Sequence, residues 1–218
     1  METWKLVYFY IIIAAVCSFL PIVGRYIAIV NTLIHEVWHV FAAIISGRKF
    51  RLVHKINLNR DASGTALTQT DSWIGRIFIA YMGYTGSSVT AYGLFYLLMK
   101  EHYIAILCIF ACVACISLVL WVRNLYGLLW TISFLAFNFW IFYYDKPLIL
   151  QHASIFLSCV VLVQSVWTAF IVFRLSIKQS KNAGDATALA EATKIPAFIW
   201  GVVFLGQSLY FVYLIFLL

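Results

Sequence analysis

Charged residues are scarce in this sequence, and their scarcity excludes most classes of protein. Asp, Glu, Lys and Arg make up 11% of the 218 residues, less than half of the roughly 25% usual in soluble domains. Hydrophobic residues make up 64% and aromatic residues 18%. This composition excludes a soluble globular protein, a disordered chain and a small disulfide scaffold. The apolar residues suffice for at most about seven membrane spans of about 20 residues each, which leaves no separate soluble domain.

Cysteines outside apolar runs are also lacking. The five cysteines are Cys17, Cys108, Cys112, Cys115 and Cys159. We expect them to be buried as small apolar side chains rather than to form disulfides or a zinc knuckle.

Apolar runs separated by charged or turn residues predict an all-α polytopic membrane protein with seven transmembrane helices. The predicted spans are 4–20, 26–46, 73–99, 102–122, 125–144, 148–173 and 196–218. Together they predict a single membrane-embedded domain over residues 1–218. With a cytosolic amino terminus, twelve of the 15 Lys and Arg residues lie on the cytosolic side, and only Arg25, Lys100 and Lys146 lie outside. This asymmetry follows the positive-inside rule and explains the net charge of +7 without a nucleic-acid partner.

Two stretches between the spans predict small structures on the cytosolic side. Apolar and polar residues alternate over Phe50–Asn59, and the turn-like Asp61–Gly64 follows, so we predict a β-hairpin over about 50–70. The second stretch, 176–194, predicts a loop that Asp185 caps into a short helix.

The second predicted span contains His35-Glu36-Val37-Trp38-His39, an H-E-x-x-H pattern. Residues four apart lie on one face of a helix, so both imidazoles can bind one tetrahedral Zn²⁺. Glu36 lies beside them as a candidate general base. The structural alternative is that both histidines only pack in the bundle. Ionisable residues inside a membrane helix are energetically costly and usually mark function, which favours the metal site.

The chain resembles the site-2 protease family of intramembrane zinc metalloproteases, and in particular its small B-like members without PDZ or CBS domains. The motifs that carry the resemblance are His35–Ala43, Gly83-Tyr84-Thr85-Gly86-Ser87 and Asp185–Ala190, with Thr193 and Pro196 beyond them. The resemblance implies Zn²⁺ as cofactor, a membrane-anchored protein as substrate, and an integral protein of a bacterial plasma membrane. We expect both the amino terminus and the active-site opening to face the cytosol.

The resemblance also implies a third zinc ligand, an Asp from a later segment. The Asp-Gly motif of typical family members is absent, and the B-like members instead resemble Asp185-Ala186. From the residues alone, a helix N-cap is an equally good interpretation of Asp185. Asp71 and Glu191 remain rival candidates for the third ligand.

The expected function is hydrolysis of peptide bonds within the membrane. The alternative is a non-catalytic metal-binding membrane scaffold or pseudoprotease. A substrate helix must unwind before its backbone can reach a metal, and the predicted strand Phe50–Asn59 offers an edge to which the unwound segment could add.

Overall fold

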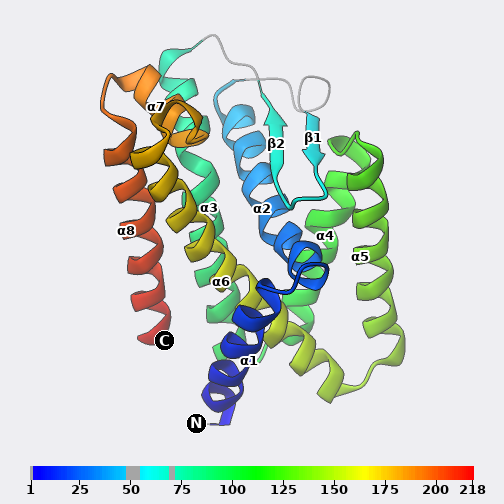
Figure 1. Cartoon of the computed structure of the whole chain (residues 1–218). Coiled ribbons are helices and arrows are strands. Elements are labelled where there is room, and N and C mark those ends of the chain that lie inside the picture. Colours follow the sequence, from blue (N-terminus) through cyan, green and yellow to red (C-terminus); the bar gives the residue numbers. More distant parts are fainter. Residues whose placement is uncertain (1, 48–54, 69–71) are drawn as a thin grey trace.

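The computed structural model describes residues 2–47, 55–68 and 72–218 (Figure 1). Those residues form helices around one two-stranded antiparallel sheet. The helices are α1 (Glu2–Ser18), α2 (Val23–Ile45), α3 (Trp73–Met99), α4 (Tyr103–Leu120), α5 (Leu125–Tyr144), α6 (Pro147–Lys178), the 3-10 turn η1 (Ser180–Asn182), α7 (Asp185–Thr193) and α8 (Ala197–Phe216). The strands are β1 (Lys55–Leu58) and β2 (Gly64–Leu67).

Five helices among the described residues, α2, α4, α5, α6 and α8, are long and apolar enough to cross a membrane. Helix α1 is shorter, with 17 residues. Helix α3 has 27 residues, but the Tyr, Gly, Ser and Thr residues between positions 81 and 93 lower its hydropathy. Helices therefore occupy all seven predicted positions, but the count of seven spans is not confirmed.

Large apolar side chains cover the outer faces of the peripheral helices. Ile104, Ile116 and Val119 of α4 and Leu129, Phe139 and Tyr143 of α5 are all exposed. Continuous apolar surface of this extent is unstable in water but suits a lipid environment. Together with the five apolar helices, it identifies an integral membrane protein.

The two termini lie at the same end of the bundle, opposite α7 (Figure 1). Trp4 at the start of α1 stacks on Phe216 at the end of α8, with ring centroids 5.6 Å apart. The predicted orientation, with the amino terminus on the same side as the hairpin and the loop 176–194, is therefore wrong. That prediction assumed that each apolar run crosses the membrane in the direction opposite to the run before it. Instead α1 packs against α6, where Ser18 accepts a hydrogen bond from Gln164 at 2.8 Å.

Helices α3 and α6 form the centre of the bundle, and each packs against both α2 and α8. Helix α6 is longer than the predicted span 148–173, because its helical structure continues to Lys178. The segment after it forms the predicted short helix, α7. Gly184 before α7 and Lys194 after it both have positive φ, at 55° and 64°, which sets the sharp turns at its two ends.

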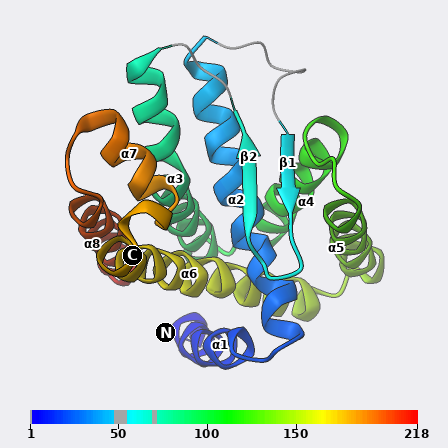
Figure 2. The same cartoon turned by 45° about the horizontal axis from the view of Figure 1, so that its top comes forward.

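The hairpin lies beside α2 and is not a separate structure on one side of the bundle (Figure 2). Strands β1 and β2 pair antiparallel, with Lys55 opposite Leu67 at one end and Leu58 opposite Gly64 at the other. The hydroxyl of Thr32 in α2 donates a hydrogen bond of 2.8 Å to the carbonyl of Ala62 in the turn. Since Thr32 precedes His35 by nearly one helical turn, the hairpin extends along α2 past the predicted metal site. The part of the predicted hairpin at 50–54 and 69–70 lies outside the described residues.

The connection between α4 and α5 covers the outer edge of β1. The N–H of Ile56 donates to the carbonyl of Trp121 at 2.9 Å, and the N–H of Arg123 donates to the carbonyl of Ile56 at 3.3 Å. The side chain of Asn124 accepts from the N–H of Leu58 at 3.0 Å. Among the described residues, the edge of the sheet that no further strand or loop backbone covers is therefore that of β2.

Three cysteines differ from the sequence prediction. Cys159 is buried as expected, but Cys108, Cys112 and Cys115 are exposed on the outer face of α4. An apolar run is compatible with burial in protein or with contact to lipid, and this face of α4 points outward from the bundle. Although Cys112 and Cys115 have C-x-x-C spacing, they belong to no metal-ligand cluster among the described residues.

Candidate metal centre

His35 and His39 project from one face of α2, as their spacing of four residues requires. Their Nε2 atoms are 3.0 Å apart, and the ring centroids are 4.6 Å apart. His39 is buried, with an exposed fraction of 7%, whereas His35 is partly exposed. The two imidazoles thus present adjacent nitrogen atoms to a single point.

A backbone hydrogen bond fixes the tautomer of His39. Its Nδ1 lies 2.7 Å from the carbonyl oxygen of Ile79 in α3. A carbonyl can only accept, so Nδ1 carries the proton, and in the neutral ring Nε2 keeps a free lone pair. Histidines that bind metals are commonly held in this way by a backbone carbonyl.

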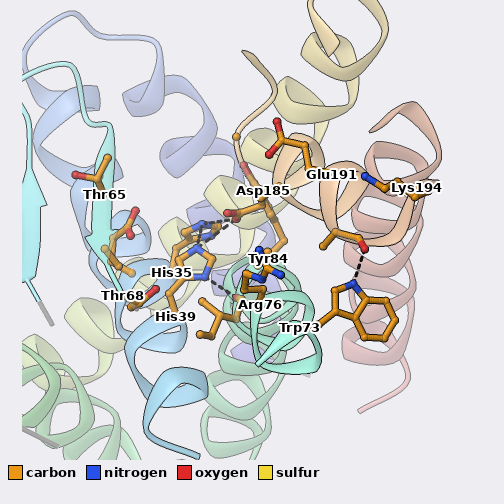
Figure 3. A pocket seen from close by; sticks show the side chains of 18 residues that line it. His35, His39, Thr65, Thr68, Trp73, Arg76, Tyr84, Asp185, Glu191 and Lys194 are labelled. Carbon is orange, nitrogen blue, oxygen red and sulfur yellow. Dashed lines mark hydrogen bonds and ion pairs between the residues drawn. The ribbon is translucent and has the colours of Figure 1, made fainter. Parts of the chain in front are cut away.

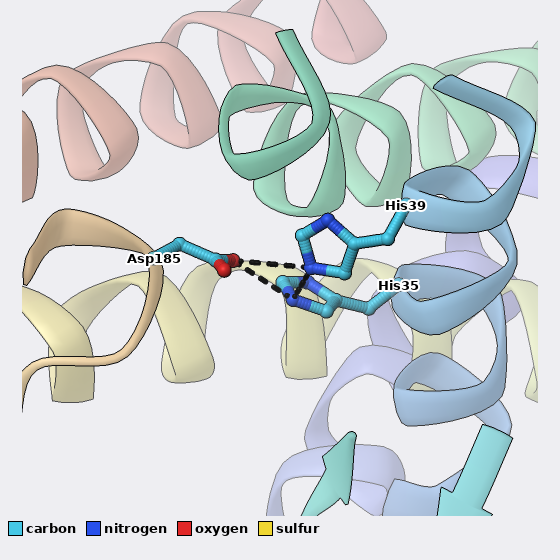
Figure 4. Close-up of side chains that lie close together, drawn as sticks. All are labelled: His35, His39 and Asp185. Carbon is cyan, nitrogen blue, oxygen red and sulfur yellow. Dashed lines mark hydrogen bonds and ion pairs between the residues drawn. The ribbon is translucent and has the colours of Figure 1, made fainter. Parts of the chain in front are cut away.

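Asp185 completes the cluster from α7 (Figure 4). Its Oδ2 lies 3.2 Å from the Nε2 of His35 and 3.2 Å from the Nε2 of His39. Asp185 is the first residue of α7, and the N-cap position belongs to Gly184 with no side-chain capping bond. The capping interpretation of Asp185 is therefore wrong, because the carboxylate turns toward the histidines instead.

The charge of Asp185 follows from the same neighbours. Burial opposes its ionisation, but the imidazoles of His39 and His35 outweigh burial and hold the pKa of the carboxyl well below its usual range. The group is thus an anionic oxygen donor. Of the rival ligands, Glu191 lines the same cavity but is not part of the cluster, and Asp71 lies outside the described residues.

Glu36 is buried between α2 and the hairpin, with an exposed fraction of 4%. A Cβ placed on Gly64 of β2 would lie 2.7 Å from the Glu36 Oε1, so only glycine allows the strand to lie this close. The backbone N–H of Ala66 forms a hydrogen bond with the Glu36 carboxyl group. Strand β2 therefore fixes the position of the predicted general base.

Two glycines of α3 lie against side chains of α2. A Cβ on Gly83 would lie 2.5 Å from the His35 Cε1 and 2.6 Å from the His39 Cε1. A Cβ on Gly86 would lie 2.0 Å from the Trp38 ring. Both glycines thus allow α2 and α3 to pack closely, and Gly83 in addition lies against both imidazoles.

A cavity of about 1040 Å³ surrounds the cluster (Figure 3). His35, Glu36, His39 and Asp185 line it together. Further lining residues come from three elements: Gly64, Thr65, Ala66 and Thr68 in or after β2; Trp73, Arg76, Ile79, Ala80 and Tyr84 in α3; and Ala188, Glu191 and Ala192 in α7, with Lys194 after it. The cavity is thus large enough to hold water beside the cluster.

Two residues of this site were given no role from the sequence, Gly64 and Tyr84. The sequence shows Gly64 only as part of a turn, and its contact with Glu36 depends on how the hairpin packs on α2. Tyr84 falls within the Gly83–Ser87 motif, and its ring meets that of His35 edge to face at a centroid distance of 4.6 Å. The sequence did offer one signal, because this motif and H-E-x-x-H lie on successive predicted spans, which cross the membrane antiparallel and can pack side by side.

Comparison with known proteins gives one match. The Peptidase M50B-like family matches the chain over residues 8–215, nearly its full length. No curated protein and no solved structure matched the chain. The match agrees with the site-2 protease resemblance seen in the sequence, and the chain, an integral membrane protein, belongs to the Peptidase M50B-like family.

Proposed function

We propose that this protein is an intramembrane zinc metalloendopeptidase that hydrolyses peptide bonds of membrane-anchored proteins. One observation carries the proposal: three lone-pair donors from two distant segments converge beside a buried carboxyl group in one cavity. Membership of a peptidase family supports hydrolysis as the reaction.

The donor set fits zinc in type and spacing. Two imidazole nitrogens and one carboxylate oxygen are typical ligands of a catalytic zinc site, which keeps a fourth position open. Bonds of about 2.0–2.1 Å in a tetrahedron place ligand atoms about 3.3–3.4 Å apart. The three separations here are 3.0, 3.2 and 3.2 Å, so only small shifts are needed. We assign His35, His39 and Asp185 as the ligands.

Glu36 performs the proton transfers in this proposal. Bound zinc supplies Lewis acidity, which makes a coordinated water more acidic and polarises the scissile carbonyl. Glu36 lines the same cavity and accepts the proton of the attacking water. It then delivers that proton to the leaving amine. Burial of Glu36 against β2 holds its carboxyl group in place for both transfers.

The free edge of β2 is the proposed docking site for the unwound substrate. Ile56 and Leu58 direct their backbone groups to the α4–α5 connection, so their antiparallel partners, Ala66 and Gly64, direct theirs to the opposite edge. The Ala66 N–H bonds Glu36 there, so the Ala66 carbonyl and the Gly64 backbone groups are the ones proposed to pair with the substrate. That edge borders the cavity. Addition to β1, the strand favoured from the sequence, is blocked by the α4–α5 connection at Ile56 and Leu58.

Strand addition can be tested with backbone N-methylation of a cleaved peptide. Methylation removes one N–H donor at a time, and in a paired strand only alternate residues use theirs toward the neighbour. We expect cleavage to fall at every second position on one side of the scissile bond. A uniform effect along the peptide would contradict pairing with β2.

We also propose that the α7 end of the bundle faces the cytosol. Among the described residues, five cations lie toward the α7 end: Arg76 near the start of α3, Arg174 and Lys178 near the end of α6, Lys181 in η1 and Lys194 after α7. Three lie toward the end with the termini: Lys5 near the start of α1, Lys100 after α3 and Lys146 before α6. This distribution still favours a cytosolic α7 end. The amino terminus would then lie on the external side.

The decisive experiment compares wild type with Glu36→Gln, in purified zinc-loaded protein and in cells. Glutamine keeps the shape of the side chain but can neither accept nor deliver the proton, so zinc content should stay the same and cleavage should be lost. Substantial turnover by Glu36→Gln would refute the general-base role. Full cellular function of a Glu36→Gln protein that no longer cleaves would instead favour the non-catalytic scaffold.

A further inference from the structure

Tyr84 is held rigidly at the edge of the histidine pair. Its ring meets the His35 ring at 77° with centroids 4.6 Å apart, and it packs on Phe204 of α8 at 4.7 Å. It directly follows Gly83, where α3 touches both imidazoles. The ring is therefore fixed on two sides by aromatic neighbours.

The hydroxyl of Tyr84 has no hydrogen-bond partner within the described parts of the chain, and the side chain lines the cavity. The nearby Tyr81 differs, because its hydroxyl donates to the Oε1 of Gln207 at 2.9 Å. Buried tyrosine hydroxyls usually find a partner. An unused donor on a side chain that lines the cavity has a ligand as its natural partner.

Neither the residues of the cluster nor Glu36 supplies such a donor. Asp185 and the Nε2 of His39 present lone pairs, and Glu36 must be ionised to act as a base. The cationic residues Arg76 and Lys194 also line the cavity, but both are exposed. Tyr84 is in ring contact with a proposed ligand and carries a neutral hydrogen-bond donor.

We propose that Tyr84 is a catalytic residue that donates a hydrogen bond to the carbonyl oxygen of the scissile peptide as negative charge develops on it. The phenolic proton stays on Tyr84, so the interaction only stabilises the transition state and the tetrahedral adduct. This inference rests on the proposed protease function. It adds a protein donor to the polarisation that bound zinc provides.

The test is Tyr84→Phe in the full-length, zinc-loaded protein, which removes the hydroxyl and keeps the ring. The probe is a library of single-span peptides with a fluorophore and a quencher, from which the best wild-type substrate is taken. Loss of one oxyanion donor should lower kcat roughly 10²- to 10³-fold while KM changes less than about twofold. Tyr81→Phe is the matched control and should leave kcat within about twofold, because its hydroxyl bonds Gln207.

Two further readouts separate catalysis from structure. Zinc content and melting temperature of Tyr84→Phe should match those of wild type, because the aromatic contacts remain. A phosphinic peptide, which mimics the tetrahedral adduct, should bind Tyr84→Phe more weakly by about the same factor as kcat falls.

Several results would overturn the inference. If Tyr84→Phe keeps the wild-type kcat, or loses zinc and thermal stability together with kcat, Tyr84 is not a catalytic donor, whereas the protease proposal stands. If zinc-loaded wild type cleaves none of the peptides and does not bind the phosphinic peptide, the protease proposal itself is refuted, and the role of Tyr84 with it.

Discussion

Substitution of Gly83 by alanine should disable the metal site without unfolding the bundle. The added Cβ would lie 2.5 Å from the His35 Cε1, 2.6 Å from its Nε2 and 2.6 Å from the His39 Cε1. Ordinary van der Waals contact begins near 3.4 Å. The difference means that both rings must withdraw by about 0.8–0.9 Å, or that α3 must shift by a similar distance.

Such a displacement exceeds what a zinc site tolerates, since ligand distances deviate by no more than about 0.2 Å. We expect zinc affinity to fall at least about 10- to 100-fold, as it does when the groups that orient ligands are lost. Peptide cleavage should fall with it. The cost of overpacking to folding should be about 1–3 kcal/mol.

Two matched variants on α3 separate the possible causes. A Cβ on Gly93 meets nothing within 4 Å, so Gly93→Ala should retain zinc and gain about 0.5–1 kcal/mol of stability from its helix position. A Cβ on Gly86 would meet the Trp38 ring, so Gly86→Ala should destabilise the helix pair while leaving the histidines in place. The assay is zinc titration against a competing chelator, with thermal unfolding measured in parallel. Wild-type zinc affinity in Gly83→Ala, or equal loss in all three variants, would refute this reasoning.

Four further predictions test the site, the hairpin and the orientation. His35→Ala and His39→Ala should each lose zinc and all cleavage, and stoichiometric zinc in either would contradict the assignment. Asp185→Asn should weaken zinc binding about 10- to 100-fold, because an amide is a poor substitute for a carboxylate ligand; unchanged zinc and activity would move attention to Asp71 or Glu191. Gly64→Val should lower kcat while zinc content stays constant, since its Cβ would displace Glu36 and not the ligands; loss of zinc there would be inconsistent with this geometry. In intact cells, external protease should remove a tag from the amino terminus but spare one inserted at Lys181, and the reverse pattern would invert the proposed orientation.

The wrong prediction of the side on which the amino terminus lies shows how much composition can predict in a membrane protein. Apolar runs located each long helix to within a few residues, since length and hydropathy are local properties. The direction of α1 relative to the rest of the bundle is not a local property of the sequence. It depends on the packing of α1 against α6 and on the Trp4–Phe216 contact, which joins the two ends of the chain.

The hairpin shows a similar division between what the local sequence predicts and what tertiary packing decides. Period-two alternation predicted strands near 50–70, and β1 and β2 lie within that range. The choice of docking edge depended on the α4–α5 connection, which is about 65 residues away in sequence from the strand it covers. No local pattern reports which edge of a two-stranded sheet another segment will occupy.

The sequence by itself determined the membrane class and the pairing of His35 with His39, because helical spacing alone places residues four apart on one face. It supplied Asp185 only through a family resemblance, with helix capping as an equal alternative. The tertiary structure brings the Asp185 Oδ2 to 3.2 Å from the Nε2 atoms of both imidazoles, which lie about 150 residues earlier in the chain, and this proximity supports the proposed ligand role. It also sets the surroundings of Gly83, Gly64 and Tyr84, since each makes a contact between helices or between strand and helix, and such contacts arise only when the elements pack.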